Sequence, residues 1–300
     1  MDFVYKDPFM MTMLKAGISG MKVVKQGQRS KVGVVETKIG DGNNTVVTKW
    51  DKASEAAILP ILLASGLNVR SEEAGFVGNS LRTDFVWIVD PLDGSKPFVI
   101  KAPTSTLSVA LFDTTRKRVI ASVVLRPVDG FVVFAAEGQG TWSFYYEGDL
   151  ATDLLAAERC HVNSDDLGKK SIVLVDCYRD FKLKDHPVVE DQVWGEFMKD
   201  LFVTTSGMYA FGSNCIFYVL VALGGDGMVG AITTCRGGPH DITVVETVIE
   251  AGGYAQGFSN QTGELVEVDP LNALGCNFMV AANTKKNLDA LVQFFKKHVG

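Results

Sequence analysis

Several features that mark large classes of protein are missing from this chain. Its five cysteines are scattered, with no CxxC and no paired Cys/His spacing, which argues against a zinc site and a disulfide framework. No basic run accompanies the formal net charge of −6, so a nucleic acid polymer is not expected as a partner. The longest apolar stretches, such as 58–63 and 216–223, are too short to cross a bilayer. We expect no secretory signal, because the first residues lack a basic region and a small-residue cleavage site. These absences favour a cytoplasmic protein with reduced thiols and no membrane contact.

What the chain does contain is enough apolar sequence to build a large core: 47% of its 300 residues are hydrophobic and 21% are charged. That length suits one large domain or two of about 150 residues. Pro60 is expected to kink or split the helix in which it lies. Apolar spacing predicts helices over residues 8–21, 50–63, 189–201, 215–223, 241–251 and 285–298. Alternating or apolar runs predict strands over residues 32–38, 86–89, 106–112, 119–125, 130–136 and 171–176.

The order of these elements indicates the fold class. Strands gather in the first half of the chain, whereas strands alternate with helices in the second. This order favours an α+β half over residues 1–150, followed by an α/β half over residues 151–300. The composition turns polar between residues 146 and 166, which makes that stretch a reasonable junction.

The most informative run is Asp90-Pro-Leu-Asp-Gly-Ser95, which follows an apolar strand. Because proline fixes its φ angle and lacks an N–H, Pro91 is expected to end the strand and to place Asp90 and Asp93 on a tight loop. A glycine at position 94 lets the backbone approach a ligand closely and point its N–H groups at it. Two carboxylates and a peptide carbonyl are hard oxygen ligands, suited to Mg²⁺ beside a phosphate.

Three further acidic segments lie at the ends of expected strands or helices, where loops carry function. Asp51 leads into a helix, Glu72 and Glu73 close a strand, and Asp241 begins an apolar helix that stops at Gly253. Taken singly, each of these residues also suits helix capping or a solvated turn. Together, and in this order, the acidic segments are far more specific.

That order resembles the inositol monophosphatase superfamily, which includes 3′(2′),5′-bisphosphate nucleotidases and fructose-1,6-bisphosphatases. The similarity extends from about Lys38 to Gly253. It implies a layered α-β-α-β-α sandwich of the sugar-phosphatase type, with metal-binding loops in residues 1–150 and residues 151–300 completing the active site. It also implies a homodimer and the hydrolysis of a small phosphate monoester with two or three Mg²⁺ ions.

The resemblance also assigns roles to individual residues. Asp51 and Ser95 would orient and deprotonate the attacking water, with Glu73 as a supporting carboxylate. Asp90 would bridge two metal ions, which together neutralise the phosphoryl oxygens and supply a hydroxide. The metal ligands would be Glu72, Asp90, the backbone carbonyl of Leu92, Asp93 and Asp241. The phosphate or its leaving group would be lined by Gly94, Ser95, Gly212 and Ser213.

Departures from the family pattern bear on the substrate. His240 stands where the family usually has tryptophan, and we expect a packed or hydrogen-bonded imidazole there. No acidic residue precedes the final motif to hold sugar hydroxyls, which weakens an inositol assignment. Lys96 resembles the lysine of the 3′-phosphoadenosine-5′-phosphate phosphatases, although a solvated surface lysine is an equal alternative. Arg236 is a second candidate anion contact. A 3′-phosphonucleotide such as adenosine 3′,5′-bisphosphate is therefore slightly favoured over an inositol or sugar phosphate.

Two alternatives belong to other classes of function. The run from Gly225 to Gly230 satisfies G-x-G-x-x-G, which is found in NAD-binding oxidoreductases. Its context is wrong, because we expect a helix before it and no helix after it. A non-catalytic metal-binding relative is the other alternative, and the presence of all the acidic positions together with Ser95 argues against it.

Overall fold

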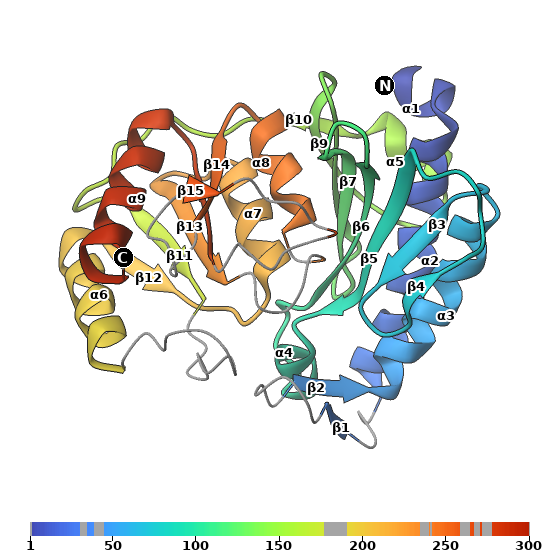
Figure 1. The fold of residues 1–300 in the computed structure, drawn as a ribbon, viewed down its shortest axis with the longest axis horizontal. Coiled ribbons are helices and arrows are strands. Elements are labelled where there is room, and N and C mark those ends of the chain that lie inside the picture. Colours follow the sequence, from blue (N-terminus) through green and yellow to red (C-terminus); the bar gives the residue numbers. More distant parts are fainter. Residues whose placement is uncertain are drawn as a thin grey trace.

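A computed structural model describes residues 2–30, 35–38, 45–176, 191–234, 240, 242–258, 265–266, 271 and 278–299. Its helices and sheets form five layers (Figure 1). From right to left in that view, the layers are α2 with α3, the first sheet, α7 with α8, the second sheet, and α6 with α9. The expected α-β-α-β-α sandwich is therefore confirmed.

The first sheet has eight strands, in the order β10-β9-β8-β7-β6-β5-β3-β4. Neighbouring strands are antiparallel except for β3 and β5, which are parallel. A separate antiparallel pair is formed by β1 (Val35–Lys38) and β2 (Thr45–Thr48). The strands of the first sheet are β3 (Asn68–Ser71), β4 (Gly75–Val77), β5 (Phe85–Asp93), β6 (Thr106–Asp113), β7 (Arg118–Arg126), β8 (Phe131–Ala136), β9 (Gly140–Tyr145) and β10 (Glu158–Cys160).

The second sheet has six strands, in the order β12-β11-β13-β16-β14-β15. Here β11 is parallel to both of its neighbours, and the remaining pairs are antiparallel. Its strands are β11 (Ile172–Val175), β12 (Gly207–Tyr209), β13 (Met228–Thr234), β14 (Tyr254–Phe258), β15 (Leu265–Val266) and β16 (Phe278–Ala282). The chain passes from one sheet to the other between Cys160 and Ile172. The division into halves at residue 150 stays a prediction.

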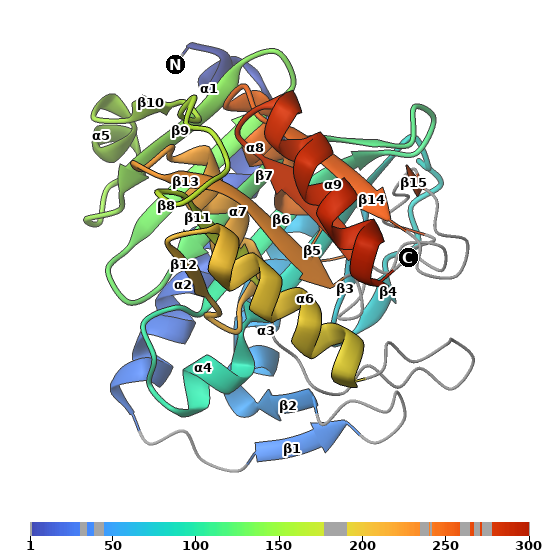
Figure 2. The same ribbon diagram turned by 90° about the vertical axis from the view of Figure 1, so that its left-hand side faces the viewer.

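The start of α2 shows how the local sequence sets the residue at which a helix begins. In α2 (Pro8–Arg29), Pro8 occupies the first turn and the Phe9 N–H donates to the Asp7 carboxylate at 2.8 Å. The others are α1 (Asp2–Lys6), α3 (Lys49–Leu63), α4 (Ser95–Val99), α5 (Leu150–Leu155), α6 (Asp191–Thr204), α7 (Asn214–Ala222), α8 (Glu246–Glu250) and α9 (Lys285–Val299). Figure 2 shows α6 and α9 side by side over the second sheet.

The layers are held together by apolar cores, of which the three largest among the described residues follow. The first lies between α2, α3 and the first sheet, and includes Met13 and Trp87. The second surrounds α7 between the two sheets, and the third fills the space under α6 and α9 around Phe295. Among the described residues, no helix combines the length and hydropathy needed to cross a membrane.

Local expectations failed at three places. Helix α3 continues through Pro60 as one helix, so the expected split is wrong, while a kink at Pro60 stays a prediction. Strand β5 continues past Pro91 to Asp93, so the expected end of the strand at Val89 is wrong. The register against β6 shifts between Asp90 and Asp93, and such an irregularity accommodates a proline within a sheet. The helix expected over 241–251 is a 3₁₀ turn (Thr243–Val245) followed by the short α8.

Candidate active site

The acidic run at the end of β5 is buried. Asp90 is 2% exposed and Asp93 is 6% exposed, although both carry carboxylates. The Leu92 N–H donates to Asp90 Oδ1 at 2.9 Å, which fixes the Asp90 side chain against its own strand. Burying charged groups is costly unless they have strong partners, so paired aspartates at a strand end indicate a functional site.

The turn from β5 into α4 requires glycine. Gly94 has φ +80°, a left-handed conformation that other residues rarely adopt. A Cβ atom at this position would lie 3.0 Å from the Ser213 Cβ and 3.1 Å from the Gly212 carbonyl oxygen. The turn therefore packs directly against the segment that leads into α7, and the expected role of these residues at a phosphate stays a prediction.

The proposed water-activating pair is brought together. Ser95 Oγ donates to Asp51 Oδ1 at 2.7 Å, and it lies 3.2 Å from the Leu92 carbonyl oxygen. Asp51 is 1% exposed in the first turn of α3. Its Oδ2 accepts from the Thr48 N–H at 2.8 Å and from the Thr48 hydroxyl at 2.6 Å, which forms a capping box. Burial raises the pKa of Asp51, and the hydrogen bonds from Thr48 and Ser95 oppose that shift.

Asp93 is held by hydrogen bonds from the start of α7 and from β6. Its Oδ2 accepts from the Ser213 hydroxyl at 2.5 Å, the Cys215 N–H at 2.8 Å and the Thr106 hydroxyl at 2.9 Å. Among the described residues, its Oδ1 accepts a single long contact, of 3.3 Å, from the Asn214 N–H. The helix N-terminus stabilises the negative charge, and Oδ1 retains capacity for a further partner. Ser213 thus holds Asp93, while its expected place at the phosphate stays a prediction.

Glu72 and Glu73 lie in the turn between β3 and β4, and both are half-buried. The Glu72 N–H donates to the Val89 carbonyl at 3.1 Å, so this turn is attached to β5 one residue before Asp90. The buried Glu55 of α3 contacts the same turn. Sequence analysis missed Glu55, although its spacing of four residues from Asp51 was a usable signal, since i and i+4 share a helix face.

Other expected site residues lie elsewhere or outside the described part. Asp241 and Arg236 are outside the described residues. Lys96 is exposed on α4, next to Ser95. His240 is 5% exposed, which fits the expected packed imidazole. Gly230 lies within β13, so the dinucleotide-binding alternative, which needs a helix there, is wrong.

The donor chemistry at the end of β5 fits Mg²⁺. Asp90, Asp93 and the Leu92 carbonyl offer only oxygen ligands, which hard divalent cations prefer. Within the residues that the structure describes, no three His, Cys, Asp or Glu side chains lie close enough to hold a metal ion. Asp241, which the resemblance adds to the ligand set, is not among them.

The five layers and the carboxylates at the end of β5 define a protein of the sugar-phosphatase fold class. The sequence profile of the inositol monophosphatase family matches residues 6–299, so the chain belongs to this family.

Individual relatives are distant. Phosphatase IMPL1 of Arabidopsis thaliana, a chloroplastic protein, is 26% identical over 71% of this chain and 53% of its own length. Nus factor SuhB of Haemophilus influenzae is 28% identical over 45% of this chain and 49% of its own length. The chain thus spans about half the length of these curated relatives.

Solved structures agree in fold. An IMPase of Thermotoga maritima superposes with a TM-score of 0.73 at 22% identity, over 100% of this chain and 98% of that one. The suppressor protein suhB of Bartonella henselae gives a TM-score of 0.74 at 18% identity, over 97% of this chain and 99% of that one. At these identities the likeness shows the fold alone.

Proposed function

We propose that the chain is a Mg²⁺-dependent phosphomonoesterase that hydrolyses a small phosphorylated metabolite with an activated water. The observation that carries the proposal is the Ser95–Asp51 hydrogen bond of 2.7 Å beside the buried carboxylates of β5. A serine hydroxyl with a buried carboxylate behind it is suited to general-base chemistry. Membership of a phosphatase family supports the same activity.

The oxygen ligands would come from residues on both halves of the chain. When bound, Mg²⁺ would neutralise the phosphoryl oxygens and lower the pKa of a water, so that the water can lose a proton and attack phosphorus. Asp90, Asp93 and the Leu92 carbonyl would hold Mg²⁺, since all three offer oxygen ligands at the end of β5. The ligand set is Glu72, Asp90, the Leu92 carbonyl, Asp93 and Asp241, with two or three Mg²⁺ ions.

Ser95 and Asp51 would together take up the proton of the attacking water. Ser95 Oγ donates its proton to Asp51, so its lone pairs are left to accept a proton from water. As the water loses that proton, Ser95 passes its own to Asp51. Burial raises the pKa of Asp51, which makes this carboxylate a better proton acceptor. Thr48 keeps Asp51 oriented through two hydrogen bonds to the other oxygen.

The proposed substrate is a 3′-phosphonucleotide such as adenosine 3′,5′-bisphosphate. Lys96 follows Ser95 directly and is exposed at the start of α4, where an ammonium suits a second phosphate. Arg236 is proposed as a further anion contact. Inositol 1-phosphate and fructose 1,6-bisphosphate are the alternatives within the same activity. We further propose a cytoplasmic homodimer, consistent with the family resemblance and the buried thiols of Cys160 and Cys215.

A phosphate-release assay over a panel of esters tests the proposal. The panel is adenosine 3′,5′-bisphosphate, inositol 1-phosphate, fructose 1,6-bisphosphate and NADP, each at millimolar Mg²⁺. We expect the highest kcat/KM for the bisphosphorylated nucleotide. Asp90→Asn serves as the site control and should abolish turnover of every ester. Turnover by Asp90→Asn near the wild-type rate would contradict the assignment of Asp90, and a preference for inositol 1-phosphate would replace the proposed substrate.

A further inference from the structure

A buried glutamate that no proposed step uses connects α3 to the β3–β4 turn. Glu55 is 8% exposed and lies one helical turn after Asp51. Its Oε1 accepts from the Ser71 hydroxyl and, at 2.9 Å, from the Ala74 N–H. A carboxylate in an apolar layer is retained only where its hydrogen bonds offset the loss of water. Here both hydrogen bonds are directed to one short segment of chain.

The two donors lie on either side of Glu72 and Glu73. Ser71 ends β3, and Gly75 begins β4 opposite it, so residues 72–74 form the tip of a hairpin. This hairpin lies at the edge of the first sheet, because β4 is the last strand in the order. Hairpin tips at sheet edges open more readily than central strands, since fewer contacts hold them. Glu55 supplies an attachment at both ends of the tip.

We propose that Glu55 is a positioning residue that holds Glu72 and Glu73 where they can bind Mg²⁺. The inference rests on the proposed function, since it assumes that this turn contributes metal ligands. It adds that one face of α3 serves both parts of the chemistry. Asp51 in its first turn orients Ser95, and Glu55 in the next turn fixes the metal-binding hairpin.

The role requires a hydrogen-bond acceptor and no negative charge, because both bonds end on the same oxygen. Glu55→Gln keeps a carbonyl oxygen that can accept both bonds, whereas Glu55→Ala removes it. Ser71→Ala removes one of the two donors without changing α3. Ile58→Val is the matched control, because this fully buried residue lies on the same helix, its truncation costs about 1 kcal/mol, and its side chain has no hydrogen-bonding group.

The experiment measures Mg²⁺ binding to the full chain by isothermal titration calorimetry without substrate. Protection of the Ala74 amide from hydrogen exchange is followed in parallel. We expect Glu55→Ala to weaken Mg²⁺ binding roughly ten-fold and to expose the Ala74 amide. Ser71→Ala should weaken Mg²⁺ binding less than Glu55→Ala does. If Glu55→Ala does not fold, the result for Ser71→Ala tests the positioning role by itself. Glu55→Gln and Ile58→Val should bind Mg²⁺ within about two-fold of wild type, well below the loss typical of removed ligand supports.

The outcomes separate this inference from the function on which it rests. If wild type binds Mg²⁺ and both Glu55→Ala and Ser71→Ala bind it equally well, the positioning role is wrong while the phosphatase proposal stands. If Glu55→Gln loses as much affinity as Glu55→Ala, charge and not hydrogen bonding is responsible, and the inference is again overturned. If wild type binds no Mg²⁺, the proposed function itself fails.

Discussion

A buried aspartate lies at the start of each of the two helices, α3 and α7, that flank the acidic run of β5, and the two aspartates have different surroundings. On the α3 side, Asp51 belongs to the helix itself, and burial raises its pKa despite the capping hydrogen bonds. On the α7 side, Asp93 comes from a distant strand and caps the helix from outside, with its Oδ2 surrounded by donors. Both carboxylates are buried at the start of a helix, where the helix dipole favours a negative charge, and they differ in whether they belong to that helix.

The difference fits the proposed role of Asp51. A carboxylate that accepts a proton benefits from a raised pKa, which burial provides on the α3 side. The hydrogen bonds to Asp93 instead join β5 to β6 and to the start of α7. The same residue type therefore has different partners at the two helices.

The largest expected effect on stability distinguishes the two sides directly. Asp93→Ala leaves the Thr106 and Ser213 hydroxyls and the Cys215 N–H without their acceptor inside the protein. We expect the free energy of unfolding to fall by about 3 kcal/mol in urea titrations. Asp51→Ala should cost about 1 kcal/mol, the usual cost of losing one N-terminal capping interaction. Equal losses from the two variants would contradict the comparison.

Ser95→Ala tests the proton-transfer side of the comparison. The variant removes the hydroxyl that lies between water and Asp51, so kcat should fall by about 10² or more. The Mg²⁺ affinity should change little, because Ser95 is not proposed as a ligand. Steady-state kinetics and calorimetry measure the two quantities. A kcat within a few-fold of wild type, or a loss that appears only in the Mg²⁺ affinity, would exclude the pair as the general base.

Recognising the site from sequence depended on how local its signals are. The run from Asp90 to Ser95 was identified because neighbouring residues in the chain carry its chemistry. The continuation of β5 past Pro91 was missed, since it depends on pairing with β6, which local propensity does not contain. Residues 215–223 were correctly predicted as a helix because nearly every side chain there is apolar and buried.

Long-range hydrogen bonds account for what sequence could not provide. The donors to Glu55 lie 16 and 19 residues away, and a glutamate on a helix is ordinarily exposed. The capping of α7 by Asp93 joins residues that are 120 apart in the chain. The Asp93 contact forms only when α7 packs against the first sheet, and the Glu55 contacts form only when α3 packs against β3, so no local pattern predicts these hydrogen bonds.

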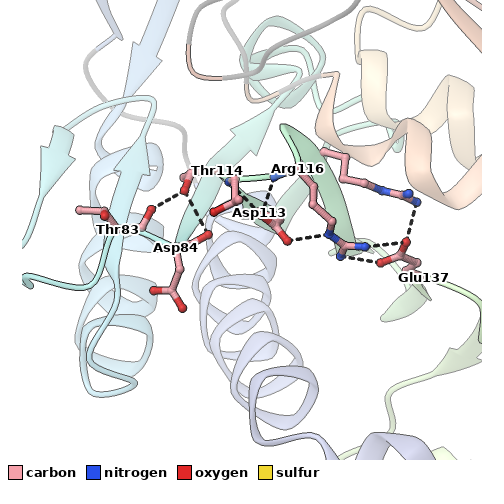
Figure 3. Close-up of polar contacts among 8 residues, drawn as sticks. Thr83, Asp84, Asp113, Thr114, Arg116 and Glu137 are labelled. Atoms are coloured by element: carbon pink, nitrogen blue, oxygen red, sulfur yellow. Dashed lines mark hydrogen bonds and ion pairs between the residues drawn. The ribbon is translucent and has the colours of Figure 1, made fainter.

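A third buried carboxylate, that of Glu246, lies on α8, outside the candidate site. Glu246, 4% exposed at the start of α8, has its pKa raised to about 7 by burial, with the nearby Glu250 adding to the shift. Arg118 opposes it, but this arginine also pairs with Glu137, at 2.9 Å. Figure 3 shows the same Glu137 paired with Arg116, at 2.7 Å. As with Asp51, burial raises the pKa of Glu246.

The consequence for stability has a defined sign. Between pH 4.5, the ordinary pKa, and about 7, the folded chain binds more protons at Glu246 than the unfolded chain. This group therefore destabilises the fold as the pH rises through that window. Glu246→Gln should be more stable than wild type at pH 8 by on the order of 2 kcal/mol, and less dependent on pH. The free energy of unfolding in urea, measured at pH 5 and pH 8, gives both the gain in stability and the pH dependence. If the difference in stability between the two pH values were the same in Glu246→Gln as in wild type, the prediction would be contradicted.

The smallest expected effect concerns the substrate. Lys96→Ala should raise KM about five-fold for adenosine 3′,5′-bisphosphate, since an exposed ammonium–phosphate contact contributes on the order of 1 kcal/mol. It should change KM for inositol 1-phosphate less. Both substrates are measured at the same ionic strength, because salt screens the contact. Lys117→Ala, at the exposed β6–β7 turn, is the control. Equal effects of Lys96→Ala on both substrates would remove the reason for favouring nucleotides.

Phosphate release by the wild-type protein with and without a chelator tests the central claim most directly. The protein is treated with EDTA, desalted, and assayed on the panel of phosphate esters before and after Mg²⁺ is restored. The account predicts no turnover in the chelated protein and full recovery of activity on at least one ester with millimolar Mg²⁺. Phosphate release that persists in EDTA, or the absence of turnover of every ester after Mg²⁺ is restored, would contradict it.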